Sequence, residues 1–594
     1  MAAGVLRRWG RLWYRDTPRW VRGVLSVTAG VLGVVLIVRP ATSLGALALL
    51  IGTAMLLTAV LELVARTAEE DRPRWHIVTA IAWAVGGLFV LAWPALTVDL
   101  VAITVGILLV VNGVGSLLAA LRRTHAWDLR VTDAAFGVSG VVFGVLALAW
   151  PDVALLVVAV VFGARLIMSG AVELFRAVRG TRPSAATAEG RRRGRGRIVT
   201  AVASAVLAIA LAAVTLLLHG GTPVVDAFYA APRDVPDEPG QLIRAEAFER
   251  GVPEGARAWR ILYTTTDGED EPRVASGLVV VPREGAGDWP VIDWAHGTTG
   301  AAQHCAPSLL SEPFESGAMF LLPDVIAAGW ALVASDYTGL GTAGPHPYLV
   351  GDPTARSVLD ARRAAAQLAD ADLGARTVVW GHSQGGGAAL WAGAIADGYA
   401  PDLPIEGVAA MAPAADTVNL IDAATTFPGG SIFTSYAVEA YTRTYDDIAR
   451  REYLRPGVDG IVRTLAKRCL AEPGLAVSVL TALGLSQDPD IFSQSPTEGR
   501  LGARLTENIA PAGATMPLLI AQGAADSLVG AVGQDEYVAS LCAVGQQVDY
   551  RRYDGLQHVS LVQPGSALVP ELMEWTAARF AGAEAPTGCA VAER

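Results

Sequence analysis

Residues Gly381-His382-Ser383-Gln384-Gly385 follow the apolar run 377–380 and precede 386–392, which has the composition of a helix. The order is therefore strand, tight turn, helix. A turn this tight strains the backbone of the serine and leaves little room beside it, which explains the flanking glycines. It presents the hydroxyl of Ser383 at the N-terminus of a helix, where the helix dipole favours negative charge. The pattern predicts that Ser383 is a nucleophile.

A G-x-S-x-G turn in this setting is the nucleophile elbow of α/β-hydrolases, in which an acid and then a histidine follow the serine. His558 is the one histidine after Ser383, so it is the candidate base. Asp526 follows the strand-like run 518–521 and a glycine turn, where the acid belongs. Asp416 and Asp554 are rivals, but Asp416 comes one strand too early and Asp554 lies four residues from His558. We predict a catalytic triad of Ser383, Asp526 and His558.

The second half of the chain alternates strand-like and helical stretches. Apolar β-rich runs occur at 260–263, 277–281, 291–294, 331–334, 378–380, 408–411, 518–521 and 548–550, and helical stretches at 354–371 and 384–397. This alternation predicts a mostly parallel sheet covered on both faces. The segment 417–508 is helical in pattern, and we expect it to form a cap over Ser383.

A serine hydrolase also needs two N–H donors for the oxyanion of its tetrahedral intermediate. We expect one from the backbone of Gln384 and the other from the loop after strand 291–295, which contains Thr298 and Thr299. His296 begins that loop. It either acts as in the His-Gly-Gly loops of other esterases or has a structural role at the strand end.

The first half of the chain has the opposite charge and a different composition. Residues 1–222 hold 22 Arg and 11 acidic residues, whereas the remainder holds 24 basic and 46 acidic residues. Apolar runs at 23–38, 44–64, 77–93, 98–120, 131–149, 153–175 and 198–218 predict seven transmembrane helices. Lys467 is the only lysine, a usage typical of a GC-rich bacterial genome.

The distribution of arginine between the loops predicts the membrane topology of these helices. Arg-rich segments lie at 1–23, between the second and third helices, between the fourth and fifth, and at 176–197. By the positive-inside rule they are cytoplasmic, which places residues after 220 outside the cytoplasm. We expect a cytoplasmic N-terminus at 1–22, a six-helix membrane domain at 23–178, a basic linker at 179–197, a seventh helix at 198–218 and an outer domain at 223–594.

The membrane domain contains a threefold repeat. Pro40, Pro94 and Pro151 recur at spacings of 54 and 57 residues, as do Gly52, Gly106 and Gly163. Three helical hairpins therefore share one design, with small residues where helices approach closely. The repeat resembles the HdeD-like (DUF308) family of bacterial membrane proteins over residues 20–178. Glu62, Arg165 and Glu173 lie within or at the ends of spans, and a transport role for them stays an alternative.

Several motifs of the outer domain resemble a second family. They are Asp226-Ala227-Phe228-Tyr229, Trp294 to Gly300, Cys305-Ala306-Pro307-Ser308, Ser335 to Gly341, and the elbow itself. Together they resemble the secretory lipase family, of the Candida antarctica lipase A type, over residues 223–580. The resemblance implies ester hydrolysis, a helical cap and an oxyanion donor near Thr299. Thr299 stands where the yeast-type lipase has an Asp.

All four cysteines, Cys305, Cys469, Cys542 and Cys589, lie in the outer half. An even number in an exported domain predicts disulfides, for which three pairings exist. The lipase resemblance favours Cys305–Cys469 and Cys542–Cys589. The sequence has no zinc-ligand spacing, phosphate-binding loop or basic aromatic patch, so we expect no metal, cofactor or nucleic-acid partner.

These observations lead to a membrane-anchored extracytoplasmic lipase or esterase of a bacterial cell membrane, acting on a lipid or other ester. One alternative is a membrane sensor or transport protein whose outer domain only binds a ligand. Another is a peptidase or acyltransferase, because the same fold and triad serve these reactions too.

Overall fold

The computed structural model describes residues 19–38, 75–92, 94–121, 127–149 and 222–594, apart from 456–457, 473–474 and 486–490. It also describes 202–210, 212–213 and isolated positions between 53 and 175. The chain divides into two compact units: the first comprises 1–217 with the segments 454–461 and 480–491, and the second comprises the rest of the chain. Each unit is described by itself.

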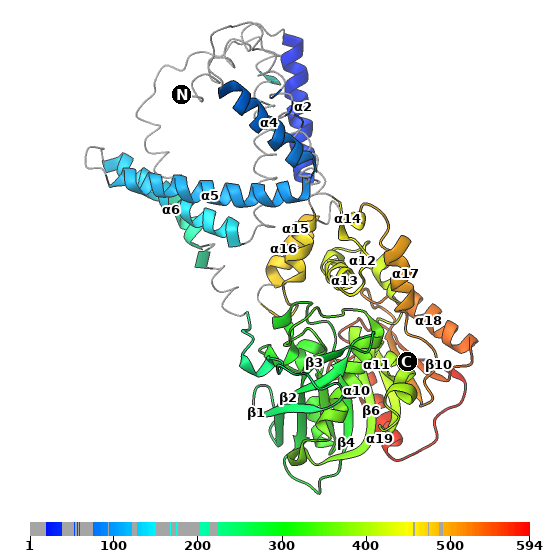
Figure 1. Cartoon of the computed structure of the whole chain (residues 1–594). Coiled ribbons are helices and arrows are strands. Elements are labelled where there is room, and N and C mark those ends of the chain that lie inside the picture. The colour runs from blue at the N-terminus through cyan, green and yellow to red at the C-terminus, as the bar shows by residue number, and fades with distance from the viewer. Residues whose placement is uncertain are drawn as a thin grey trace. The chain divides into compact units, whose positions relative to one another are not determined.

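Up to residue 217 the chain is helical where it is described (Figure 1). Its long helices are α2 (Arg19–Val38), α4 (Trp75–Ala92), α5 (Pro94–Ala120) and α6 (Trp127–Ala149). They match four of the seven predicted spans, and Pro94 is the first residue of α5, a position that proline tolerates. Of the other three predicted spans, 44–64 and 153–175 lie largely outside the described residues, and 198–218 is helical where it is described, at 202–210 and 212–213. Among the described helices, Arg130–Ala149 is long and apolar enough to cross a membrane.

Glycines allow α5 and α6 to pack closely together. A Cβ on Gly113 would lie 2.6 Å from the backbone nitrogen of Val141, and one on Gly144 would lie 2.7 Å from the carbonyl oxygen of Gly106. Both distances are too short for any larger residue unless the backbone moves. The close approach of helices at small residues, predicted for the repeat that includes Gly106, is therefore confirmed for this pair.

The second unit is built on a ten-stranded sheet. The strands are β1 (Leu242–Phe248), β2 (Ala256–Thr266), β3 (Pro272–Pro282), β4 (Trp289–Ala295), β5 (Ala331–Ser335), β6 (Leu373–His382), β7 (Ile405–Met411), β8 (Leu518–Gly523), β9 (Val548–Tyr553) and β10 (Cys589–Glu593). Their order is β1-β2-β3-β5-β4-β6-β7-β8-β9-β10. Strands β1 to β3 pair antiparallel, β3 pairs antiparallel with β5, and the rest are parallel.

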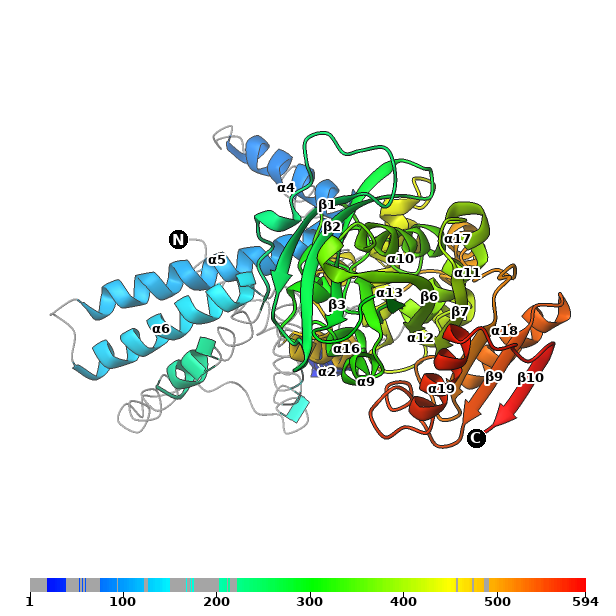
Figure 2. The ribbon, with the colours of Figure 1, turned by 90° about the horizontal axis from the view of Figure 1, so that it is seen from below.

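Helices cover both faces of this sheet (Figure 2). Helices α10 (Gly351–Ala365), α11 (Gln384–Tyr399) and α18 (Ala531–Ala543) pack on one face, and α9 (Leu322–Ala327) and α19 (Leu568–Phe580) on the other. Side chains of a strand alternate between faces. Val379 accordingly belongs to the core beneath α10 and α11, whereas its neighbour Val378 belongs to the core beneath α19. The α/β-hydrolase fold with a large, mostly parallel sheet is confirmed.

The chain between β7 and β8 is helical, as the sequence predicts. It holds α12 (Thr417–Ala424), α13 (Gly430–Thr444), α14 (Arg450–Tyr453), α15 (Asp459–Ala466), α16 (Leu475–Leu485) and α17 (Gly499–Glu507). Asp416 explains where α12 begins, because its Oδ1 accepts hydrogen bonds from the backbone nitrogens of Val418 and Asn419 at 3.1 and 3.0 Å. Satisfying free N–H groups in this way is the work of a helix N-cap.

Candidate active site

Ser383 lies between β6 and α11 with the backbone that the motif predicts. Its φ of 58° and ψ of −122° are strained for a residue with a side chain. The neighbouring glycines are required: a Cβ on Gly381 would lie 2.0 Å from the carbonyl oxygen of Gly385, and one on Gly385 would lie 2.0 Å from that of Ala295. The backbone nitrogen of Ser383 donates to the carbonyl oxygen of Met411 at 3.0 Å, which ties the turn to β7.

Asp526 meets His558 in a buried contact. Asp526 Oδ2 accepts from His558 Nδ1 at 2.8 Å and from Gln522 Nε2 at 3.1 Å. Asp526 Oδ1 accepts from the backbone nitrogens of Leu528 and Val529 at 2.8 and 2.9 Å. Burial alone would raise the pKa of Asp526. The hydrogen bond and charge of His558 and the two backbone N–H groups outweigh burial, so the pKa is lowered and the carboxylate stays ionised.

The two rival acids are placed elsewhere. Asp416 is occupied as the N-cap of α12, where its Oδ2 also accepts from Asn419 Nδ2 at 2.8 Å. Asp554 is exposed and lies in the turn after β9. Neither carboxylate contacts an imidazole among the residues that the structure describes.

Ser383 and His558 line the same cavity. No hydrogen bond joins Ser383 Oγ to His558 in the described part of the chain. Such contacts are commonly loose without substrate and tighten in the reactive complex.

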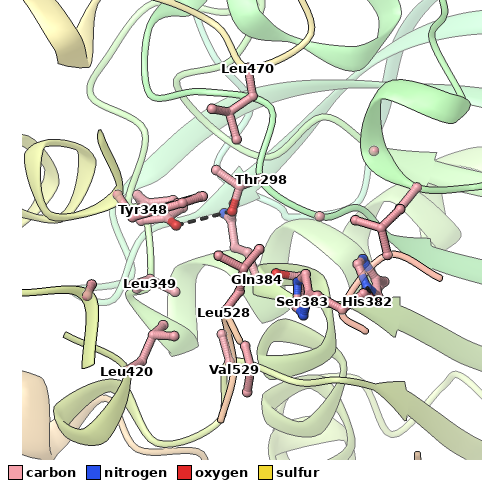
Figure 3. A pocket seen from close by; sticks show the side chains of 18 of the residues that line it. Thr298, Tyr348, Leu349, His382, Ser383, Gln384, Leu420, Leu470, Leu528 and Val529 are labelled. Carbon is pink, nitrogen blue, oxygen red and sulfur yellow. Dashed lines mark hydrogen bonds between the residues drawn. The ribbon is translucent and has the colours of Figure 1, made fainter. Parts of the chain in front are cut away.

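The cavity has a volume of about 210 Å³ and mostly apolar walls (Figure 3). Its apolar side chains come from the main sheet domain and from the helical insert: Phe320, Leu349, Leu420, Ile421, Phe427, Phe433, Leu470, Leu528, Val529 and Val559. Its polar side chains are Thr298, Glu315, Ser316, Tyr348, His382, Ser383, Gln384 and His558. Such walls suit a hydrocarbon chain next to one reactive group.

The predicted oxyanion residues fall into two groups. Gln384 and Thr298 line the cavity, and Thr298 Oγ1 lies 3.1 Å from Tyr348 Oη (Figure 3). Gln384 is the first residue of α11, so its backbone N–H has no partner within the helix. Thr299 lies outside the cavity wall, with its buried hydroxyl donating to the carbonyl oxygen of Cys305 at 2.8 Å.

Three buried histidines complete the surroundings, and the sequence indicated a role for only one of them. His382 Nε2 donates to the carbonyl oxygen of His558 at 3.1 Å, and the two rings lie 4.7 Å apart. Burial and the neighbouring His558 lower the pKa of His382 to about 3, so it is neutral at pH 7. His346 Nε2 accepts from Gln384 Nε2 at 3.0 Å. The third, His296, contacts the backbone carbonyl oxygens of Gly297 and Asp336.

Both predicted disulfides are present. The Cα atoms of Cys305 and Cys469 are 5.3 Å apart, and those of Cys542 and Cys589 are 5.9 Å apart. The first joins the loop after β4 to the helical insert, and the second joins α18 to β10. Among the described residues, the cluster of metal-ligand types is His304 with Cys305 and Cys469, whose sulfurs are bonded to each other.

Comparison with known proteins identifies two families in the chain. Residues 314–588 match the secretory lipase family, and residues 21–92, 78–145 and 135–217 match DUF308, a short repeat of unknown function. A Mycobacterium tuberculosis protein named "probable inactive lipase" is 28% identical over 61% of this chain and 83% of its own length. Lipase A of Moesziomyces aphidis is 25% identical over 59% of this chain and 79% of its own.

A solved structure agrees on the fold. Candida antarctica lipase A in its closed state aligns with a TM-score of 0.51 at 20% identity, covering 62% of this chain and 88% of that one. The identity is low, so this likeness concerns the fold alone.

Proposed function

Because residues 314–588 belong to the secretory lipase family and residues 21–217 carry DUF308 repeats, we propose that the chain is a membrane-anchored serine carboxylic-ester hydrolase. Its hydrolase domain faces outside the cytoplasm. The observation that carries the proposal is the 2.8 Å contact between Asp526 and Nδ1 of His558, a residue that lines the same cavity as Ser383. Nucleophile, acid and base thus follow one another along the chain in the order of the fold.

The reaction proceeds through an acyl-enzyme. As Ser383 Oγ attacks the ester carbonyl carbon, His558 Nε2 takes the hydroxyl proton and Asp526 stabilises the imidazolium. The tetrahedral intermediate collapses, the C–O bond to the alcohol breaks, and His558 gives its proton to the departing alcohol. A water molecule then attacks the acyl-enzyme, again losing its proton to His558, and the acid is released as Ser383 regains its proton.

The backbone N–H groups of Gln384 and Thr298 hold the oxyanion of each tetrahedral intermediate. Two observations support this assignment: both residues line the cavity beside Ser383, and both N–H groups are free of partners in the described structure. Thr299 contributes indirectly, since its hydroxyl fixes the loop to Cys305.

The apolar walls favour an ester with a hydrocarbon acyl chain over a polar peptide. The membrane location rests on the seven apolar runs and on the arginine distribution, which orients the seventh helix outward. Residues 198–218 would then link the hydrolase domain to the bilayer of a bacterial cell.

A ligand-binding domain without activity is the second candidate. Two observations favour it: a relative named "probable inactive lipase", and the missing hydrogen bond between Ser383 and His558. The chain nevertheless retains all three triad residue types in order, which an inactive domain does not need.

The experiment uses the full-length chain purified in detergent. We expect a fluorophosphonate to label Ser383 and p-nitrophenyl esters to be hydrolysed, and Ser383→Ala to lose both. Ser540→Ala is the matched control, because this exposed α18 serine bonds only the carbonyl of Tyr537. Ester binding without labelling or hydrolysis would support the ligand-binding candidate instead.

A further inference from the structure

The peptide group between Gly297 and Thr298 is held by the ring that precedes it. His296 Nδ1 lies 2.7 Å from the carbonyl oxygen of Gly297. A carbonyl oxygen can only accept, so Nδ1 carries the ring proton. This carbonyl and the Thr298 N–H belong to the same planar amide. A hydrogen bond to the carbonyl end therefore fixes the direction of the N–H end and polarises it.

The other ring nitrogen has a weaker contact. His296 Nε2 lies 3.3 Å from the carbonyl oxygen of Asp336, and a neutral imidazole has one N–H to donate. The proton is therefore on Nδ1, which makes the shorter contact, with the Gly297 carbonyl oxygen. Burial lowers the pKa of His296 to about 4, against the effect of the two carbonyls, so the ring is neutral at pH 7.

Tyr337 in turn holds His296. Its hydroxyl donates to the backbone carbonyl oxygen of His296 at 3.0 Å, and the two rings lie 4.3 Å apart. Tyr337 is fully buried and has a φ of 65°, an unfavourable value for an aromatic residue. Its backbone nitrogen donates to Ser335 Oγ at 2.9 Å, which secures the strained turn after β5. Strain of this kind persists only where surrounding contacts enforce it.

Gly317 packs closely against His296 from another side. A Cβ on Gly317 would lie 2.7 Å from His296 Cβ, and the carbonyl of Gly317 accepts from the backbone nitrogen of Gly297 at 3.0 Å. The loop is thus held from the Gly317 side and from the Tyr337 side.

We propose that His296 is a positioning residue that aims the Thr298 N–H at the oxyanion, and that Tyr337 keeps His296 in place. The inference rests on the proposed ester hydrolysis. It assigns the histidine after β4 a role through the Gly297 carbonyl, without contact with the substrate.

Two substitutions of His296 distinguish the role of Nδ1 from that of Nε2. The side-chain nitrogen of Asn stands as many bonds from Cα as His Nδ1, and that of Gln as many as His Nε2. Both lose the imidazole ring equally. We therefore expect His296→Asn to keep kcat within about fivefold of the wild type. We expect His296→Gln to lose about 30-fold, less than the 10²–10³-fold typical for removing a whole oxyanion donor.

The full-length chain is assayed with p-nitrophenyl butyrate, and rates are expressed per site titrated with fluorophosphonate. KM should change less than about twofold, because the donor acts on the transition state. The inhibition constant of an alkyl boronic acid, which forms a tetrahedral adduct on the serine, should rise in parallel with the loss of kcat. A purely structural role would lower the number of titrated sites and leave kcat per site unchanged.

Should His296→Gln not fold, Tyr337→Phe is the second variant, because it keeps the aromatic ring beside His296 and loses the hydrogen bond to the His296 carbonyl oxygen. We expect about a fivefold loss of kcat and a parallel rise in the inhibition constant of the alkyl boronic acid. Equal kcat per site in all variants, or a larger loss in His296→Asn than in His296→Gln, would overturn the inference while ester hydrolysis stands. A wild-type chain that hydrolyses no ester and takes no fluorophosphonate would overturn both proposals.

Discussion

Asp526→Asn tests the proposed triad most directly, because the surroundings of Asp526 fix which way an asparagine amide must point. With the amide nitrogen in place of Oδ1, two N–H groups of the backbone, at Leu528 and Val529, would face another donor. With the nitrogen in place of Oδ2, both backbone bonds survive and only the contact with Gln522 is lost. The orientation with the amide nitrogen in place of Oδ2 is therefore favoured.

That orientation places an N–H group against His558 Nδ1. The imidazole responds by moving its proton to Nε2, where it can no longer accept the proton of Ser383. We expect kcat to fall by about 10⁴-fold with KM almost unchanged, a loss of roughly 5.5 kcal/mol in transition-state stabilisation. The fold should persist, since the backbone bonds that secure the 526–529 turn remain.

The assay is steady-state hydrolysis of p-nitrophenyl esters by the full-length chain, with the thermal unfolding midpoint measured beside it. Asp416→Asn is the matched control, because asparagine caps a helix as well as aspartate does, and its kcat should stay within about threefold. An Asp526→Asn variant within tenfold of the wild type would refute the assignment of the acid.

Three other predictions concern the rest of the chain. Replacing Cys305 and Cys469 by Ala should lower both stability and kcat, because Cys305 holds Thr299 beside the proposed donor. Replacing Cys542 and Cys589 by Ala should cost at most about 4 kcal/mol of unfolding free energy and leave kcat intact. Denaturant unfolding and steady-state kinetics of both variants check this, and equal losses of kcat would contradict it. Burial raises the pKa of Glu472 to about 7, and His304 Nε2 lies 4.0 Å from its carboxylate. The folded state therefore keeps a proton that the unfolded state releases near pH 4.5. Wild-type stability should fall as the pH rises from about 4.5 to about 7. Glu472→Gln should flatten that part of the stability profile in calorimetry, and an unchanged slope would exclude Glu472 as its cause. Alkaline phosphatase fused after Ala227 should be active and after Gly190 inactive, and the reverse pattern would overturn the proposed topology.

The central strands could be predicted because each is a short apolar run with turn residues on both sides. Strands β1 and β10 were missed. Leu242–Phe248 carries charged residues and is half-exposed at a sheet edge, and Cys589–Glu593 pairs with β9 on one side only, so neither has the apolar signal of a buried strand. The helix expected at 354–371 ends at Ala365, and a separate 3₁₀ turn at Ala369–Ala371 follows.

Chain order alone leads to the candidate triad residues, whereas residues that meet only in space could not be found from the sequence. Asp416 could have been recognised as a helix cap from Asp416-Thr417-Val418-Asn419, a local pattern. His382 stands inside the elbow motif, yet its contact with the His558 carbonyl spans 176 residues. Tyr337 and His346 likewise reach the site through long-range contacts that no local pattern encodes.

The tie between Thr299 and the helical insert constrains how substrate gains entry. Beside the Cys305–Cys469 bond, the backbone nitrogen of Leu470 donates to the carbonyl oxygen of Thr299 at 2.8 Å, and Leu470 itself lines the cavity. The disulfide anchors this part of the cavity wall covalently, so we do not expect this part to move aside. A gate that admits an ester would instead have to open where α12 and α13 border the cavity with Leu420, Ile421 and Phe433, which no disulfide restrains.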